Sequence, residues 1–372
     1  MRIGIVTLPL HTNYGGILQA YALQKVLEDM GHKVEHLQPK VYFQKLHPDW
    51  KMPLVWCKRS YRRFVKNEKG LPIFIHPHKW IRKNTDKFIK KHINSRYIKS
   101  KDWSVLLSQE YDAVLFGSDQ VWRPLYAYQI ERYFGSFLQG SSVKRISYAA
   151  SFGTIDNEYS AEQQNTCSGL LKGFTAVSVR EKSAVGMCKL MFGVDAEHVL
   201  DPTLLLLKED YIKLFEQTAT TKSVGNLAVY VLDESKATAE FVQRMAEKNG
   251  LVPFRTNSKV EDYDAPILER LQPPVEEWLR SFHDAELVIT DSFHACVFSI
   301  IFRIPFICIG NKGRGSARFE SLLSMFGLED RLVDISDIDD VPLSPINWQY
   351  VEEILLQKKE AAIAFIKNSL DK

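Results

Sequence analysis

Residues 286–309 constrain the fold more strongly than any other stretch of the sequence. The run 287–289 is short, apolar and rich in β-branched residues, which predicts a strand, and an apolar helix and a second strand follow it. Thr290, Asp291 and Ser292 separate strand from helix and are typical of a helix N-cap. A helix that begins at the carboxyl edge of a parallel sheet directs unpaired N–H groups into the crevice where such sheets bind ligands. We therefore expect an α/β fold with an anion site at this turn.

His294 lies in the first turn of this expected helix. It is the only side chain there that can exchange a proton near neutral pH, so we predict that it is catalytic. Asp291 and Ser292 are predicted to contact the anion. The alternative interpretation is that these two residues only cap the helix and that His294 is a buried structural histidine.

The chain has 372 residues, of which 45% are hydrophobic and 25% charged, as in a soluble protein too long for one core. The N-terminus begins directly with a strand and no apolar run is as long as a membrane span, which favours a cytoplasmic protein. Five scattered cysteines favour free thiols over disulfides or metal ligation. A net charge of +3 is too small to indicate nucleic-acid binding.

Strand–helix alternation starts at the N-terminus and restarts near residue 222. We expect three parts: a first domain over 1–221, a second over 222–346, and a terminal helix over 347–372 that packs back on the first domain.

The N-terminal segment predicts a strand, a turn and an amphipathic helix. Gly15 and Gly16 lie where the strand passes into the helix, and their spacing is not that of a dinucleotide-binding GxGxxG motif. Because this junction is at the binding edge of such folds, we predict that Asn13, Tyr14 and Gly15 contact an acceptor. The alternative is a tight turn with no ligand.

Two further apolar strands are predicted to end in polar side chains. Ser118, Asp119 and Gln120 follow the first, and Arg180 ends the second. Ser118 and Gln120 are predicted to contact the acceptor. Asp119 could orient or deprotonate a sugar hydroxyl, and Trp122 could stack on a sugar ring; the alternative is a helix cap with a core aromatic. Arg180 could hold a carboxylate or phosphate through two parallel hydrogen bonds.

Basic residues gather in two other places. Residues 41–99 contain far more basic than acidic residues, interleaved with aromatics, which predicts a positively charged insertion that contacts a membrane surface or is simply a solvated helical face. Arg314 and Arg318 flank glycines in a loop that enters a late helix. We expect at least one of these two arginines to contact the anion.

The chain carries seven motifs in a fixed order: NYGGILQAYALQ, GSDQVW, ISYAASFG, VSVREKS, VLDPTLLL, ITDSFHACVFSI and RGSARFESLL. Together they resemble the polysaccharide pyruvyl transferase family. The resemblance implies two Rossmann-like domains in a GT-B-type arrangement with an interdomain cleft, and phosphoenolpyruvate as the pyruvyl donor. It associates His294 and Arg180 with the donor. Ala295 stands where the family usually has glycine.

The resemblance implies a transferase that forms a cyclic ketal between pyruvate and a sugar, and we expect it to need neither metal nor cofactor. His294 is the expected acid, Asp119 the base, and Arg180 with Arg318 the anion clamp. The acceptor is expected to be a cell-surface polysaccharide or its lipid-linked precursor, reached at the inner face of a membrane. Two alternatives remain on the same fold: a glycosyltransferase that uses a nucleotide sugar, and a glycan-binding relative without catalysis.

Overall fold

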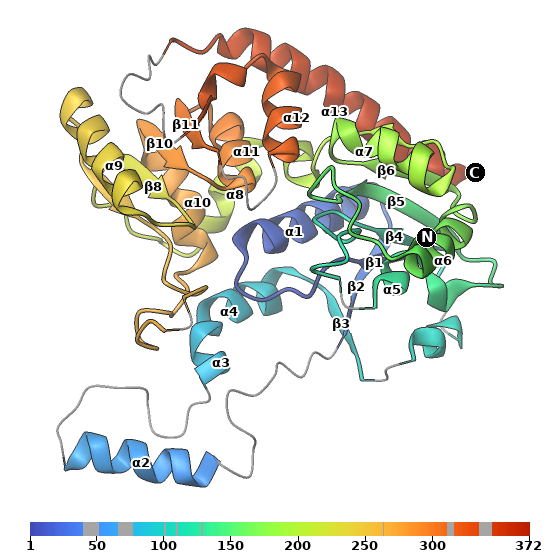
Figure 1. The fold of residues 1–372 in the computed structure, drawn as a ribbon, viewed down its shortest axis with the longest axis horizontal. Helices are drawn as coiled ribbons and strands as arrows, with labels where there is room; N and C mark the ends of the chain where they lie inside the picture. Colours follow the sequence, from blue (N-terminus) through green and yellow to red (C-terminus); the bar gives the residue numbers. More distant parts are fainter. Residues whose placement is uncertain are drawn as a thin grey trace.

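The structure is a computed structural model of the chain, and it describes residues 1–39, 52–65, 77–99, 102–108, 111–127, 129–262, 264–310, 316–334 and 344–372. Within these residues the chain forms two parallel sheets flanked by helices (Figure 1). The predicted α/β class with two Rossmann-like domains is confirmed. No helix in the described part of the chain is both long and apolar enough to cross a membrane.

The first domain is built on a parallel sheet of seven strands in the order β3-β2-β1-β4-β5-β6-β7. Its central strand β4 is buried at all four positions, as expected for a strand covered by helices on both faces. The strand bounds are β1 Arg2–Val6, β2 Lys33–Pro39, β3 Ser95–Ile98, β4 Ala113–Phe116, β5 Lys144–Ala150, β6 Ala176–Val179 and β7 Glu197–His198.

The helices of this domain begin where the sequence supplies capping side chains. Asn13 caps α1 by accepting from the N–H of Gly16, and Ser160 forms a capping box with Gln163 at α6. The bounds are α1 Tyr14–Asp29, α2 Met52–Phe64, α3 Pro77–Ile81, α4 Lys83–His92, η2 Trp103–Ser108, α5 Ile130–Tyr133, η3 Ser136–Leu138, α6 Ala161–Leu171, α7 Lys182–Met187, η4 Cys188–Phe192, η5 Pro202–Leu205 and α8 Lys208–Glu216.

The second domain has five parallel strands in the order β12-β11-β10-β8-β9. The predicted strand–turn–helix–strand unit is present as β10, α11 and β11, and α11 is buried along its whole length. The bounds are β8 Leu227–Tyr230, α9 Lys236–Asn249, β9 Pro253–Arg255, α10 Val275–Asp284, β10 Leu287–Thr290, α11 Phe293–Phe302, β11 Phe306–Ile309, α12 Ala317–Phe326, η7 Glu329–Arg331, β12 Leu332–Val333 and α13 Trp348–Asp371.

Several elements join the two domains into one body. Helix α13 contacts α12, η5 and β5, so it runs from the second domain back over the first (Figure 1). Helix α8, which falls within the range 1–221, packs against α10 of the second domain. One hydrophobic cluster continues from Ile17 of α1 through Trp278 of α10 to Phe298 of α11. The domains are therefore joined by apolar contacts as well as by the chain.

The basic segment 41–99 is not a single insertion. Its last part contains β3, which pairs in parallel with β2 at the edge of the sheet, and α4, which packs on α1. This part belongs to the first domain, because His36 and Leu37 of β2 are in register with Ser95 and Arg96. Among the described residues of the segment, only α2 stands apart from the two domains (Figure 1).

Candidate functional site

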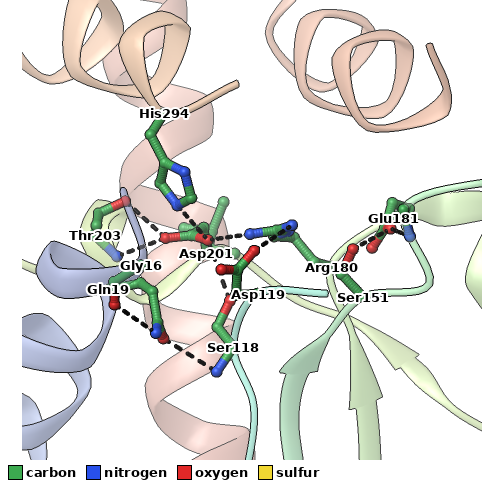
Figure 2. Close-up of polar contacts among 12 residues, drawn as sticks. Gly16, Gln19, Ser118, Asp119, Ser151, Arg180, Glu181, Asp201, Thr203 and His294 are labelled. Atoms are coloured by element: carbon green, nitrogen blue, oxygen red, sulfur yellow. Dashed lines mark hydrogen bonds and ion pairs between the residues drawn. The ribbon is translucent and has the colours of Figure 1, made fainter. Parts of the chain in front are cut away.

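The centre of the site is Asp201, which lies after β7 and caps the short helix η5. Its carboxylate is 2% exposed and accepts hydrogen bonds from Ser118 Oγ at 3.2 Å, Arg180 Nη1 at 3.0 Å, and Thr203 N at 3.0 Å. The Nε2 atom of His294 lies 3.6 Å from the same carboxylate. Figure 2 shows these side chains converging on Asp201 from different elements of both domains.

Asp201 stays ionised in these surroundings. Burial raises its pKa, but the contact with His294, the charge of Arg180 and the N–H of Thr203 outweigh burial and hold the pKa well below its ordinary value. The imidazole of His294 thus faces an ionised carboxylate. The sequence reasoning missed Asp201, although the pattern of an aspartate and a proline after an apolar run was a usable signal for a capping carboxylate.

His294 sits in the first turn of α11 and is 7% exposed. Its ring lies against Gly15 at the start of α1, where a Cβ atom would overlap Nδ1 of the imidazole. Gly15 therefore gives α1 and α11 the space to bring the two domains together at the histidine. Gly15 is buried and faces His294, and its expected contact with the acceptor stays a prediction.

Two buried arginines lie against the ring of Phe293. Arg180 Cζ is 4.5 Å and Arg318 Cζ 5.9 Å from the ring centroid, and the residues are 4% and 8% exposed. Burial lowers the pKa of Arg180, but Asp201, Glu181 and Asp119 outweigh this and the net pKa is raised. Burial and the charge of Arg180 lower the pKa of Arg318 to about 10. The site thus holds two cations within one apolar enclosure, and the second is destabilised by the first.

Asp119 reaches the cluster from the loop after β4. Its Oδ1 atom lies 3.8 Å from Nη2 of Arg180, and the residue is 6% exposed with a left-handed φ of 72°. The backbone carbonyl of Asp119 accepts from the N–H of Ser151, which fixes this loop to the end of β5. Gln120 is half-buried and accepts from Arg123 Nη1 at 3.3 Å, so it turns from Asp119 toward Arg123. The structure thus places Asp119 and Arg180, which follow two different strands, beside each other.

Glu181 is a buried carboxylate that the sequence reasoning did not assign to the site. Its Oε1 atom accepts from Ser151 Oγ at 2.5 Å and from Gly153 N at 2.9 Å, so it holds the loop that follows β5. The residue is 1% exposed and adjoins Arg180 in the chain. Its charge contributes to raising the pKa of Arg180.

Two aromatic residues predicted to touch the acceptor lie in the core. Trp122 is fully buried, stacks on Phe134 at 5.0 Å and donates from Nε1 to the carbonyl of Tyr133. Tyr14 is also fully buried, and its ring stacks on Trp278 at 5.3 Å. Both expectations are corrected, because neither ring has a free face for a sugar.

The residues at the helix N-termini differ in whether their side chains make hydrogen bonds within the protein. The carboxylate of Asp291 accepts from the N–H groups of Leu232 and Asp233, so it organises the loop after β8, and its expected contact with the anion stays a prediction. Ser292 is the N-cap of α11, yet its hydroxyl makes no capping bond. The exposed Asn13 caps α1, and Ser118 is wholly buried on Asp201.

Two further positions singled out in the sequence have simpler outcomes. Ala295 is fully buried within the hydrophobic cluster, so its extra methyl group lies in the core. Arg314 falls outside the described residues.

Tyr126 is the aromatic residue near the cluster that remains accessible. It is 45% exposed, lies beneath the guanidinium of Arg123 at 4.9 Å, and is close enough to Arg318 to raise that residue's pKa slightly. A pocket of about 440 Å³ lies between α7 and α12 and is lined by residues that include Lys182 and Ala317, close in the chain to the two arginines. Its volume is within the range of small-molecule sites.

Comparisons with known proteins agree with this arrangement. The sequence model of a family described as polysaccharide pyruvyl transferase matches residues 13–313. No curated protein sequence matches the chain. The fold is similar to UDP-GlcNAc 2-epimerase from Neisseria meningitidis bound to UDP-GlcNAc, with a TM-score of 0.51, 10% identity, and coverage of 99% of this chain and 94% of the other.

A second solved structure with a similar fold is Arabidopsis thaliana UGT89C1 complexed with UDP-L-rhamnose. Its TM-score is 0.50 at 9% identity, with coverage of 100% of this chain and 97% of the other. These likenesses extend over both domains of the chain. The predicted GT-B-type arrangement is therefore confirmed.

Proposed function

Because the chain belongs to the polysaccharide pyruvyl transferase family, we propose that it moves a pyruvyl group from phosphoenolpyruvate onto a sugar as a cyclic ketal. The proposed acceptor is a cell-surface polysaccharide or its lipid-linked precursor, modified in the cytoplasm at the inner face of a membrane. The observation that carries the proposal is the pair of buried guanidinium groups, Arg180 and Arg318, beside His294 and Asp201. Phosphoenolpyruvate has two anionic groups, one for each arginine.

The difference between the two arginines favours an anion beside Arg318. Arg180 already faces Asp201 and Asp119, whereas the pKa of Arg318 is lowered to about 10 by burial and by Arg180. A bound anion between the arginines would relieve their repulsion and accept hydrogen bonds from both. Ser292 and the first backbone N–H groups of α11 add donors on the same side.

The first chemical step is protonation of the donor. The imidazolium of His294, stabilised by Asp201 at 3.6 Å, gives a proton to the methylene carbon of phosphoenolpyruvate. The C3 atom becomes a methyl group and C2 becomes an oxocarbenium-like centre that still carries phosphate.

The remaining steps build the ketal. A sugar hydroxyl adds to C2 and gives its proton to Asp119, and the phosphate then departs with the electron pair of its C–O bond. A second hydroxyl of the same sugar adds to C2 and closes the ring. Asp119 passes the proton of the first hydroxyl to the departing phosphate, and the second hydroxyl gives its proton to the neutral imidazole of His294, so both residues return to their starting states.

Isothermal titration tests donor choice directly. We expect phosphoenolpyruvate to bind the wild-type protein, and Arg180→Lys to bind it about tenfold more weakly or worse, because a point charge replaces a bidentate fork. Arg280→Lys is the matched control, since Arg280 pairs with Asp284 on α10 outside the cluster. Phosphate release with a panel of hexose and N-acetylhexosamine oligosaccharides then reports transfer.

Two results would overturn the proposal. Binding of UDP or a UDP-sugar in place of phosphoenolpyruvate would identify a nucleotide-sugar glycosyltransferase. Binding of oligosaccharides with no donor and no phosphate release would identify a glycan-binding relative without catalysis.

A further inference from the structure

Helix α2 exposes apolar side chains that a folded protein normally buries. Leu54, Tyr61 and Phe64 are 68%, 55% and 76% exposed, and Val65, just after the helix, is 65% exposed. The spacing of positions 54, 61 and 65 places them on one side of a helix with 3.6 residues per turn. Cys57 is also exposed and falls near the same side. The apolar side of α2 therefore faces solvent.

The same helix is strongly basic. Its sequence, MPLVWCKRSYRRF, contains four basic residues and no acidic residue, at positions 58, 59, 62 and 63. These positions recur at helical spacing, on a side of the helix next to positions 54, 61 and 65. Lys58, whose side chain borders the apolar residues, is exposed. A helix with one apolar side and one cationic side is typical of elements that lie in the interface of an anionic membrane.

We propose that α2 lies in the plane of an anionic lipid bilayer, with Leu54, Tyr61 and Phe64 in the interfacial region and the basic residues at the headgroups. Charge decides between this occupant and a second copy of the chain. Two copies of α2 facing each other would bring eight positive charges together with no acidic partner in either helix, whereas anionic lipid neutralises them.

The position of α2 indicates a role for its contact with the bilayer, and this role rests on the proposed function. The helix lies in the crossover from β2 to β3, and β2 ends at the binding edge of the first sheet. After α2 the chain returns where Arg82 Nη2 donates to the carbonyl of Leu10 at 3.1 Å and Asn84 Nδ2 donates to that of Gln272 at 2.9 Å. With α2 docked on the membrane, these contacts between the domains would lie close to a lipid-linked acceptor.

Cys57 offers a direct test, because the other four cysteines are buried. The full-length protein is labelled at Cys57 with an environment-sensitive fluorophore and mixed with vesicles of phosphatidylglycerol and phosphatidylcholine. We expect a blue shift with anionic vesicles, little change with pure phosphatidylcholine, and reversal at high salt. The matched control carries the label at Leu190→Cys in a Cys57→Ser background, since Leu190 is 87% exposed away from α2. The control label should not shift.

Variants of the basic and of the apolar residues separate the electrostatic contribution to membrane binding from the apolar one. Changing Lys58, Arg59, Arg62 and Arg63 to Gln should lower partitioning onto anionic vesicles by about 100-fold or more. Changing Leu54, Tyr61 and Phe64 to Ser should abolish the blue shift. The charge-matched control changes four exposed lysines away from α2, Lys33, Lys222, Lys248 and Lys372, and should bind nearly as the wild type.

Binding that is indifferent to lipid charge, or equal in the α2 and control variants, would overturn the inference. So would a concentration-dependent dimer that the Leu54, Tyr61 and Phe64 variant converts to monomer, because α2 would then contact a second copy. Phosphoenolpyruvate titration on the same proteins is independent of vesicles. Failure of membrane binding with intact donor binding would thus reject this inference alone.

Discussion

The site has two walls, one from each domain, and the charged groups of the two walls have different surroundings. On the first-domain wall, Arg180 is surrounded by the carboxylates of Asp201, Asp119 and Glu181, and its pKa is raised. On the second-domain wall, Arg318 lies against the same phenyl ring, Phe293, and its pKa is lowered to about 10 by burial and by Arg180. The surroundings therefore raise the pKa of one arginine and lower that of the other.

This difference separates folding from function. Groups on the first-domain wall are bound into one another, so we expect their removal to destabilise the protein. The groups of the second-domain wall, His294 and Arg318, face a network that they do not hold together. We expect their conservative replacement to reduce turnover or donor affinity while leaving the fold largely intact.

Asp201→Ala should have the largest effect on stability. It leaves the buried guanidinium of Arg180 without its partner at 3.0 Å and also removes the acceptor of Ser118 and Thr203. Breaking one side of a buried pair costs about 3–5 kcal/mol, so the free energy of unfolding should fall by that amount in urea denaturation. Glu158→Ala breaks the more exposed pair with Arg123 and is the control, with a smaller expected loss.

If Asp201→Ala and Glu158→Ala destabilised the protein equally, Asp201 would not be the central residue of the wall.

Sequence patterns predicted the positions of the strand ends well, because apolar runs and polar turns are local features. The unit 286–309, Arg180 at the end of β6 and Asp119 after β4 were all predicted from such patterns. What could not be predicted is which neighbour each polar group finds. Asp201 becomes the centre of the polar network only because η5 packs beside α1 and α11, which are distant in sequence.

The aromatic residues show the same limit. Trp122 and Tyr126 lie four positions apart in one loop. The sequence there has no hydrophobic periodicity that would predict which of the two rings is buried. Tertiary packing against Phe134 encloses Trp122, whereas Tyr126 stays half exposed. Asp291 likewise has the right residue type for a ligand contact, yet two backbone N–H groups of another strand's loop bind it.

His36 provides a buried histidine without a carboxylate partner, in contrast to His294. It is fully buried, and its pKa is lowered from 6.5 to about 4 by burial, partly offset by the hydrogen bond from Nε2 to the carbonyl of Ala20. The unfolded chain therefore binds a proton below pH 6.5 that the folded protein takes up only near pH 4. Stability should be full above this window and fall by about 3 kcal/mol through it as the pH drops.

Urea denaturation from pH 7 to pH 4 measures this effect. In His36→Gln, which keeps a donor near Ala20, the loss of stability on acidification should be smaller by about 3 kcal/mol. His283→Gln replaces an exposed histidine and should retain the wild-type pH dependence. Equal acid sensitivity in all three proteins would contradict the prediction.

His294→Gln sharpens the comparison at the catalytic step. The amide keeps polar contact near Asp201 but cannot supply a proton, so turnover should fall by about 100-fold or more while phosphoenolpyruvate binding and the thermal midpoint change little. Phosphate release and titration calorimetry measure the two quantities on the same preparation. A variant that folds, binds and turns over normally would exclude the acid role, and one that unfolds would make His294 a structural residue.

Arg318→Lys should have a more moderate effect, confined to the donor. Replacing the planar fork with a point charge should weaken phosphoenolpyruvate binding by about tenfold, with a smaller change for inorganic phosphate if Arg318 holds the carboxylate. Titration calorimetry with both ligands checks the difference. If Arg318→Lys lowered stability as much as Asp201→Ala, the two walls would not differ as described.

Tyr126→Ala should give the smallest effect and should concern only the acceptor. The ring is 45% exposed, stacks on Arg123 and lies close to Arg318, so it can offer a face to a sugar at the edge of the anion site. Loss of one aromatic contact costs about 0.5–1.5 kcal/mol, so the KM for acceptor should rise by about two- to tenfold with phosphoenolpyruvate affinity unchanged. Leu125→Ala, at a neighbouring position that is 69% exposed, is the control and should leave the acceptor KM unchanged. Because Tyr126 belongs to the first domain but has no part in the network around Asp201, its replacement should leave the free energy of unfolding nearly unchanged. A loss of stability comparable to that of Asp201→Ala would show that the whole first-domain wall, including its exposed edge, is structural.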